Sequence, residues 1–287
     1  MDRPTTETTR EAFLAAATDA PPTARVPVAV RVRADAFKAY RRARGSDPCF
    51  YYETSGGAPG WGYFGVTPTR FVSVGPDGPD EGGTLDRLTD LLDGESLVRG
   101  DCDVPYPGGF FGWLSYDVAR ETEELPDDAV DDRRLPRLQA GVYPTVAAWR
   151  VPGVPGADPA DAADTLPEET TLRVVSVARV GTDPEAAYER GLERARALAA
   201  ACLDGDPSVG PPRVAADEVS FESQVGRAAY ADRVREVKRA VRDGDTFQAN
   251  VSHRLRAPAA VHPVTAFGAV RRVNPAPYSG LVEFPDV

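Results

Sequence analysis

The 287-residue sequence has few of the residues that build metal sites or disulfide frameworks. It contains two histidines, and its three cysteines, Cys49, Cys102 and Cys202, stand far apart without CxxC pairs or neighbouring histidines. This spacing predicts neither a zinc site nor disulfides, so we expect buried structural thiols. No run of about 18 apolar residues is present to span a bilayer, and the polar segment 1–10 lacks the layout of a signal peptide. We therefore expect a soluble, cytoplasmic protein without a membrane partner.

Lysine is almost absent from the sequence. Lys38 and Lys238 are its two lysines, so arginine supplies the rest of the 33 basic residues, against 44 acidic ones and a net charge of -11. Such a charge repels nucleic acid, which we exclude as a partner. The arginine-rich, acidic composition is similar to that of proteins from GC-rich, salt-accumulating cells such as haloarchaea. Any site for an anion must then be built locally from arginines, backbone N–H groups or a bound cation.

Hydrophobic periodicity predicts an α+β protein in which helices and strands are interspersed. The expected helices are Glu11–Ala17, Ala36–Arg44, Leu85–Leu92, Pro184–Leu203, Arg227–Arg242 and Pro263–Val273. The expected strands are Val26–Val32, Cys49–Thr54, Gly62–Val74, Val142–Val151, Thr171–Val180, Thr246–Leu255 and Tyr278–Phe284. The stretches 152–169 and 204–217 have the Pro, Gly, Ala and Asp content of an exposed loop and of a linker. We place a domain boundary in the linker, which gives domains 1–216 and 217–287.

The segment Tyr230–Leu255 carries the most specific motif, YADRVREVKRAVRDGDTFQANVSHRL. An amphipathic helix turns through Asp243-Gly244-Asp245 into a predicted strand that ends Ser252-His253-Arg254. It resembles the start of the chorismate-binding domain shared by anthranilate synthase component I, aminodeoxychorismate synthase component I and the isochorismate-forming enzymes. The segment Asn274-Pro275-Ala276-Pro277-Tyr278-Ser279 matches the NPxPY motif of the same family, where two prolines fix an extended turn after a helix.

Two segments of the first domain are similar to the same family. Phe50-Tyr51-Tyr52-Glu53-Thr54 resembles its LLES motif, which together with the Pro-Tyr-Met of NPSPYM helps to hold feedback tryptophan. The resemblance therefore implies an effector site, with tryptophan as effector or structural ligand, at Glu53, Thr54, Asn274, Pro275, Pro277, Tyr278 and Ser279. Ser279 replaces the methionine of the motif, which removes apolar contact with an indole ring and puts feedback by tryptophan in question. The alternative for the strand motif is a plain sheet edge and turn.

The glycine-rich segment Gly108–Asp117, GGFFGWLSYD, resembles the family's GGxxGYxxYD segment. Glycines at this density among aromatic residues indicate close approach of the backbone or a bulge. A phosphate cradle is not indicated, because neither GxGxxG nor GK[ST] is present. We interpret the segment as structural.

The resemblance implies a fold of two antiparallel β-sheets packed as a sandwich with outer helices, incomplete at the C-terminus. It also implies addition of a nucleophile to chorismate with Mg²⁺ as cofactor. Water-using members carry a lysine base where this chain has Gln248, and an amide has no useful basicity. Ammonia needs no such base, so Gln248 favours an ammonia-using member, supplied by a separate glutamine amidotransferase subunit. His253 and His262 are interpreted as a strand surface residue and as a helix cap or solvated residue.

Between the ammonia users, FQAN together with NPAPYS favours aminodeoxychorismate synthase component I of the folate and 4-aminobenzoate branch. The alternatives are anthranilate synthase component I of tryptophan biosynthesis and a non-catalytic regulatory or binding lobe. The family's metal-binding glutamates, catalytic histidine and carboxylate-binding stretch all follow the NPxPY motif, so we expect them beyond Val287 and no metal ligand within this chain. We expect the chain to be a fragment that is inactive alone.

Overall fold

The computed structural model describes residues 3–54, 58–126, 130–153, 168–212, 214–215 and 219–285. The chain forms two compact units, one of Met1–Ser208 with Phe267–Val287 and the other of Val209–Ala266. The predicted domains 1–216 and 217–287 divide the chain differently, because the last strand pairs with a strand of the first unit. As an assignment of sequence domains, that boundary stays a prediction.

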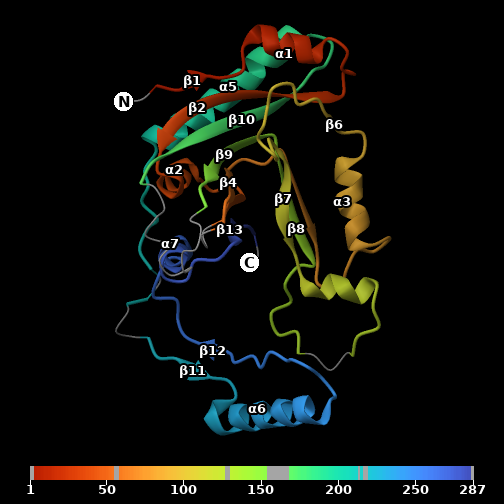
Figure 1. Ribbon diagram of the computed structural model, residues 1–287, viewed down its shortest axis with the longest axis vertical. Helices are drawn as coiled ribbons and strands as arrows, with labels where there is room; N and C mark the ends of the chain where they lie inside the picture. The colour runs from red at the N-terminus through yellow and green to blue at the C-terminus, as the bar shows by residue number, and fades with distance from the viewer. Residues whose placement is uncertain are drawn as a thin grey trace. The chain divides into compact units, whose positions relative to one another are not determined.

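The first unit is built on a large sheet (Figure 1). Its strands, in spatial order, are β1 Thr5–Thr6, β2 Ala24–Ala34, β10 Thr170–Arg179, β9 Thr145–Val151, β4 Gly60–Gly65, β3 Cys49–Glu53 and β13 Ser279–Glu283. Each neighbouring pair in this order is antiparallel, and the short β6, Ser96–Leu97, adds to β2 in parallel. Residues from opposite ends of the sequence therefore lie side by side at β3 and β13.

A smaller antiparallel sheet contains β5 Arg70–Val74, β8 Leu138–Tyr143 and β7 Gly109–Leu114. The predicted strand Val142–Val151 is wrong as one element, because Pro144 separates β8 in the small sheet from β9 in the large one. Proline has no N–H to donate to a ladder, so the chain leaves one sheet there and enters the other. The predicted run Gly62–Val74 divides in the same way, into β4 and β5.

The two sheets pack through aromatic side chains. The ring of Phe50 from β3 stacks on that of Phe111 from β7 with centroids 4.1 Å apart, and the ring of Tyr143 meets Phe50 edge-on at 4.8 Å. The Tyr52 hydroxyl donates to the carbonyl oxygen of Gly112 across the same interface at 2.8 Å. The predicted α+β class, with antiparallel sheets packed face to face, is therefore confirmed.

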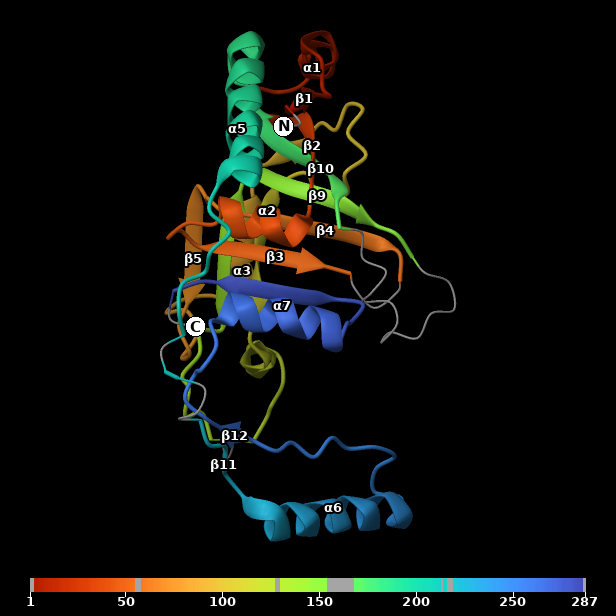
Figure 2. The same cartoon turned by 90° about the vertical axis from the view of Figure 1, so that its left-hand side faces the viewer.

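Helices lie outside the two sheets. They are α1 Arg10–Ala17, α2 Ala36–Ala43, α3 Thr84–Leu92, α5 Pro184–Asp204 and α7 Pro263–Val273, with a 3-10 helix at Tyr116–Glu121. Figure 2 shows α5, α2 and α7 one after another along one face of the large sheet. Helix α3 packs against the small sheet, where Leu88 contacts the cluster of Val74, Leu138 and Ala140. The bounds predicted for α7 are confirmed.

The second unit contains α6, Gly226–Asp243, and a two-stranded ladder of β11, Glu222–Ser223, with β12, Leu255–Arg256. Helix α6 ends at Gly244 with φ of 85°, as the sequence predicted. The predicted strand Thr246–Leu255 is wrong, because only its last residue lies in a strand. A strand needs a partner ladder, and within the described part of this unit only residues 222–223 supply one.

Among the residues that the structure describes, none of the helices combines the length and apolar character needed to cross a bilayer. Cys49 and Cys202 are free, fully buried thiols, as predicted, whereas Cys102 is half-buried. Desolvation by burial raises the pKa of both buried thiols to about 12. The two thiols therefore stay protonated at neutral pH and are structural.

A substitution at Gly112 would test how closely strands β7 and β8 approach each other. A Cβ at this position would lie 2.1 Å from the backbone oxygen of Gln139. We expect Gly112→Ala to destabilise the protein by about 3 kcal/mol, because backbone atoms of β8 must move. Gly75→Ala is the control, since nothing lies within 4 Å of its added Cβ. Urea unfolding of both variants measures the difference, and equal stabilities would contradict the close approach.

Candidate functional site

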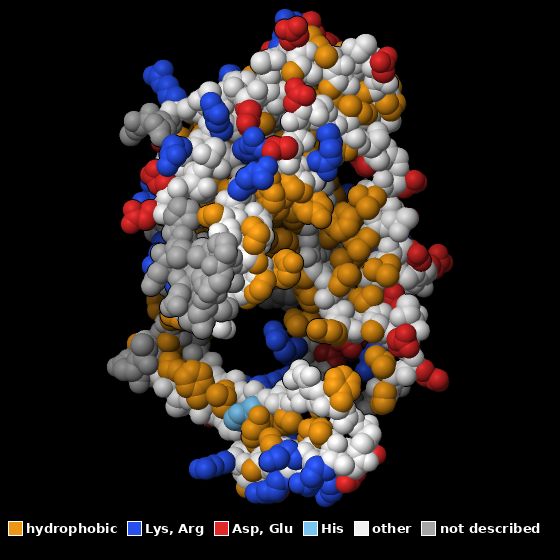
Figure 3. Space-filling view, viewed as in Figure 1, with side chains coloured by type: hydrophobic (Ala, Val, Ile, Leu, Met, Phe, Trp, Pro, Cys, Tyr) orange, Lys and Arg blue, Asp and Glu red, His pale blue; other side chains and the backbone are white. Residues whose placement is uncertain are grey.

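A cavity of about 690 Å³ opens in the first unit between β3, β4, β7 and the segment that leads into β13. Its wall is formed by residues 52–54, 58–61 and 277–280 together with Tyr63, Pro105, Tyr106, Phe110 and Phe111. Seven of these sixteen residues are aromatic, and hydrophobic side chains gather over β7 and β8 on the face shown in Figure 3. The lining residues include no lysine or arginine. The cavity is therefore suited to a flat, largely apolar ligand.

The structure brings most of the predicted effector residues together. Glu53, Thr54, Pro277, Tyr278 and Ser279 all line the cavity, because Ser279 pairs with Glu53 in the sheet. The other two predicted residues lie outside the lining. Asn274 follows the last turn of α7, where its N–H donates to Val270 at 2.8 Å, and Pro275 is buried. That these residues bind an effector stays a prediction.

Hydroxyl groups supply the polar part of the cavity wall. Thr54 is buried, and its side chain lies so close to Gly60 that a Cβ there would meet Thr54 Oγ1 at 2.4 Å. Desolvation by burial raises the pKa of Tyr52 and of Tyr63 to about 12. Both phenols are therefore neutral at physiological pH, so the cavity offers hydrogen bonds and ring faces rather than a general base.

Glu53 points its carboxylate away from the cavity and toward α7. Arg271 Nε and Nη2 donate to its two oxygens at 2.5 and 2.6 Å, and the Tyr51 hydroxyl donates to Oε2 at 2.6 Å. Glu53 is 3% exposed and Arg271 8%. Burial alone would lower the pKa of Arg271, but the hydrogen bonds to Glu53 raise it above its ordinary value, so the guanidinium stays charged. The backbone of Glu53 thus lines the cavity, and its carboxylate is paired with Arg271.

Arg271 was not among the residues predicted for this site. The guanidinium lies over the rings of Phe37, at 5.2 Å, and Tyr51, at 5.9 Å, where cation–π attraction adds to the ion pair. A signal was available, because an acidic residue at an inward position of an aromatic strand needs a basic partner elsewhere in the chain. The pattern alone does not say which of the 33 basic residues that partner is.

A second carboxylate holds the other end of β13. Glu283 accepts hydrogen bonds from Arg44 Nε at 2.6 Å and from the Tyr40 hydroxyl at 2.5 Å, and Arg44 Nη2 completes a bidentate ion pair. Desolvation raises the pKa of Glu283, but the hydrogen bonds from Arg44 and Tyr40 outweigh it, and the pKa is lowered. A charged pair therefore fixes the C-terminal end of strand β13, whereas the Glu53–Arg271 pair joins β3 to α7.

The residue predicted as catalytic, Gln248, lies in the second unit on an exposed stretch without regular structure. Its carbonyl oxygen accepts a hydrogen bond from the Thr246 hydroxyl at 3.1 Å. Exposed His253 shares a 2.8 Å hydrogen bond with the Ser223 hydroxyl, and His262 Nδ1 accepts from the N–H of Val264 at the start of α7. His262 caps a helix, as predicted, and His253 is exposed, as predicted, but the expectation that it lies on a strand is wrong because β12 begins at Leu255. A catalytic role of Gln248 stays a prediction.

Within the residues that the structure describes, no group of three or more His, Cys, Asp or Glu side chains gathers, so they offer no complete protein cage for Mg²⁺. We therefore derive no step of the chemistry through a metal ion bound by this part of the protein.

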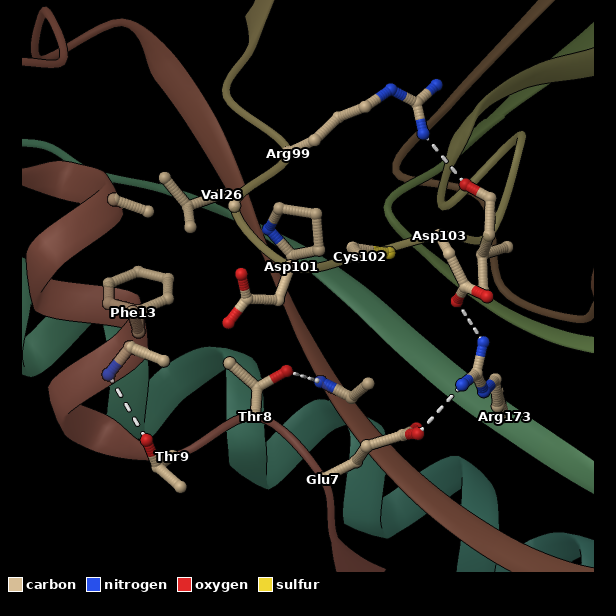
Figure 4. Close-up of a pocket in the computed structure, with 16 residues that line it drawn as sticks. Glu7, Thr8, Thr9, Phe13, Val26, Arg99, Asp101, Cys102, Asp103 and Arg173 are labelled. Carbon is tan, nitrogen blue, oxygen red and sulfur yellow. Dashed lines mark hydrogen bonds and ion pairs between the residues drawn. The ribbon is translucent and has the colours of Figure 1, made fainter.

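A second, smaller cavity of about 210 Å³ lies between α1, β2 and the loop 99–104 (Figure 4). Its floor is apolar and contains the buried ring of Phe13. Most of its charges bind one another or the backbone: Arg173 pairs with Glu7 and Asp103, and Arg99 donates to two carbonyl oxygens. These bonds fasten the N-terminal segment to the sheet, so we interpret this cavity as structural.

Comparisons of the sequence with known proteins agree on one family. The sequence model of a family described as chorismate binding enzyme matches residues 84–287. Two relatives from Haloarcula marismortui, both named anthranilate synthase component 1, are 56% and 52% identical, each over 98% of this chain. A relative from Salmonella typhimurium named aminodeoxychorismate synthase component 1 is 29% identical over 65% of this chain and 34% of its own length.

The chain spans about half the length of the curated relatives it matches, 55% and 54% for the two from Haloarcula marismortui. Among solved structures, anthranilate synthase component I from Streptococcus pneumoniae superposes with a TM-score of 0.51 and 17% sequence identity. That superposition covers 75% of this chain and 46% of the other. It supports the fold, two packed antiparallel sheets with outer helices.

The Glu283 ion pair predicts a pH-dependent stability. Because the folded-state pKa of Glu283 is lowered, its stabilisation is complete above about pH 4.5 and is lost as the pH falls through the folded pKa. Glu283→Gln should cost about 2 kcal/mol at pH 7, a typical value for hydrogen bonds to a charged group. Urea unfolding at pH 7 and pH 3.5 should show the difference from the parent shrinking at the lower pH. A difference independent of pH would contradict this assignment.

Proposed function

This chain belongs to the family of chorismate binding enzymes, and we propose that it is part of an anthranilate synthase component I, which forms anthranilate from chorismate and ammonia. The observation that carries the proposal is 56% identity, sustained over 98% of the chain, to a protein of that name. The relative named aminodeoxychorismate synthase reaches 29% over 65%. This contrast favours the anthranilate branch over the folate branch that the short motifs suggested.

The first unit, in this proposal, binds an aromatic amino acid in the 690 Å³ cavity and thereby regulates the enzyme. The aromatic wall suits an indole or phenyl ring, and Thr54 and Ser279 place hydroxyl groups in the lining. Because no cationic side chain is among the described lining residues, a ligand carboxylate would be held by the Thr54 hydroxyl and by backbone N–H groups.

The second unit, in this proposal, belongs to the part of the protein that receives chorismate. Gln248 cannot remove a proton from water at neutral pH, which supports ammonia as the nucleophile. The ammonia would come from a glutamine amidotransferase subunit. The metal chemistry that the family resemblance implies would depend on residues other than those described here, since these offer no cluster of ligands.

A chimera tests the proposed reaction. This chain would replace the matching half of the Haloarcula relative, with the relative's remaining half fused after it. We expect the chimera to form anthranilate from chorismate, ammonium and Mg²⁺, because the two sequences match over almost the whole chain. Fluorescence detects anthranilate, and chromatography separates it from 4-amino-4-deoxychorismate. The unaltered relative is the control. Aminodeoxychorismate as product would favour the folate branch, and a folded but inactive chimera would favour a non-catalytic binding lobe.

A substitution at Ser279 would test whether the cavity binds an aromatic amino acid. Ser279→Met should tighten binding of L-tryptophan about tenfold, because partial burial of a methionine side chain against the indole is worth about 1.4 kcal/mol. Ser73→Met, on the exposed face of β5, is the matched control and should leave the affinity unchanged. Calorimetric titration of the two variants and the parent gives the affinities. Weaker binding by the Ser279 variant would indicate a ligand that uses the serine hydroxyl.

A further inference from the structure

A further cavity of about 210 Å³ lies in the first unit beside the C-terminal end of α3, where the chain continues into β6. We call it the α3 cavity. Its wall also includes the first residues of β7 and parts of β2, β8 and β10. Of its described lining residues, only Phe110 also lines the 690 Å³ cavity. The α3 cavity is therefore a separate site.

The interior of the α3 cavity is apolar. Leu91, which is 8% exposed, and Val177, which is 4% exposed, form its buried part, while Leu92 lies half-exposed at the rim. Gly108 and Gly109 contribute backbone without side chains, and a Cβ at Gly108 would lie 2.8 Å from Val177. An apolar cavity of about 150 Å³ is large enough to hold benzene. A volume of about 210 Å³ is therefore sufficient for one aromatic ring with a short substituent.

An ion pair lies at the mouth of this cavity. Arg25 Nε and Nη2 donate to the two carboxylate oxygens of Glu95, at 2.5 and 2.9 Å, and both side chains are partly exposed. The hydrogen bonds from Arg25, together with the charge of Arg179, lower the pKa of Glu95. Two arginines therefore share one carboxylate. A guanidinium carries five N–H groups, so Nη1 of Arg25 can donate to a further acceptor.

A third guanidinium adds positive charge near Arg25. Arg194 extends from α5, and its Nε donates to the Ser176 hydroxyl at 3.1 Å. Desolvation, followed by the charges of Arg190 and Arg25, lowers the pKa of Arg194, so these guanidinium groups lie close together. Glu193 offsets their charge only in part. Positive charge therefore exceeds negative charge around the mouth, although the whole protein has a net charge of -11.

Charge and shape together favour one class of ligand. A ligand carboxylate at the mouth would be attracted by the excess positive charge and could accept a hydrogen bond from Arg25. The 690 Å³ cavity, by contrast, has no lysine or arginine among its described lining residues. Inside the α3 cavity, a rigid ring loses less conformational entropy on binding than a flexible apolar chain does. An aromatic acid therefore fits both parts of the site.

We propose that the α3 cavity binds a small aromatic carboxylate, with the ring against Leu91 and Val177 and the carboxylate next to Arg25. Glu95 competes with the ligand in this site, because its carboxylate occupies part of the guanidinium that the ligand would use. The proposal does not depend on amino-acid binding in the 690 Å³ cavity, so either can fail without the other.

A charge substitution tests the site, with benzoate as the probe and its neutral analogue benzamide for comparison. Glu95→Gln removes the competing carboxylate, so it should tighten binding of benzoate about tenfold and leave binding of benzamide unchanged. Glu169→Gln is the matched control, because Glu169 pairs with Arg33 near the opposite end of β2. Both ion pairs are at least partly exposed, so both variants should fold like the parent. Ligand-observed NMR titration gives the affinities.

A second pair of variants tests where the ring lies. Leu92→Ala should weaken binding of benzoate and benzamide alike, about fivefold, because the rim loses apolar surface that would contact the ring. Leu85→Ala is the matched control on the same helix: Leu85 is 49% exposed, against 51% for Leu92, but it does not line the cavity. This control should leave both affinities unchanged.

Several results would overturn the proposal. Equal effects of Glu95→Gln and Glu169→Gln would mean that benzoate responds only to net charge, and equal effects of the two leucine variants would place the ring elsewhere. Tighter binding of hexanoate than of benzoate would reject an aromatic ligand. Displacement of benzoate by saturating L-tryptophan would place benzoate in the 690 Å³ cavity instead. Absence of benzoate binding at millimolar concentration, by both the parent and Glu95→Gln, would remove the site.

Discussion

The buried ion pair between the Glu53 carboxylate and the Arg271 guanidinium joins strand β3 to helix α7, and the arrangement of the candidate cavity depends on this contact. Neither Glu53 nor Arg271 can lose its partner without leaving a charge among aromatic rings, which typically costs about 3–5 kcal/mol. The pair joins residues 218 positions apart in the sequence. It therefore fixes the helix α7, and with it the strand β13, onto a sheet whose other strands lie within residues 5–179. The candidate cavity exists because these two segments meet.

Aromatic packing and small residues determine the shape around this junction. The stack of Phe50 on Phe111 brings the two sheets together, and Gly112 allows β7 and β8 to approach closely. Gly60 leaves room for the buried Thr54 in the cavity wall. The cavity remains aromatic and uncharged because its nearest carboxylate is directed to the opposite face of β3. These features favour a flat ligand.

Short motifs were sufficient to indicate the family and insufficient to select the reaction. Pro277, Tyr278 and Ser279 of NPAPYS and the Glu53-Thr54 pair line a cavity that offers no general base, so they carry little information about which product is formed. Sustained identity along the chain favours the anthranilate branch instead. Gln248 lies on an exposed segment of the other unit, and its predicted role concerns a different step from ligand binding in the cavity.

The sequence by itself determined the local elements: α7 and the Gly244 end of α6 follow from periodicity and from a residue that tolerates positive φ. Tertiary structure decided which sheet each strand joins, because Pro144 divides an apparently continuous strand between two sheets. It also decided that most of Thr246–Leu255 forms no strand, since β propensity requires a ladder partner. The partner of Glu53 was decided in the same way: charge pairing across the whole chain depends on which elements pack together, and local pattern contains no such information.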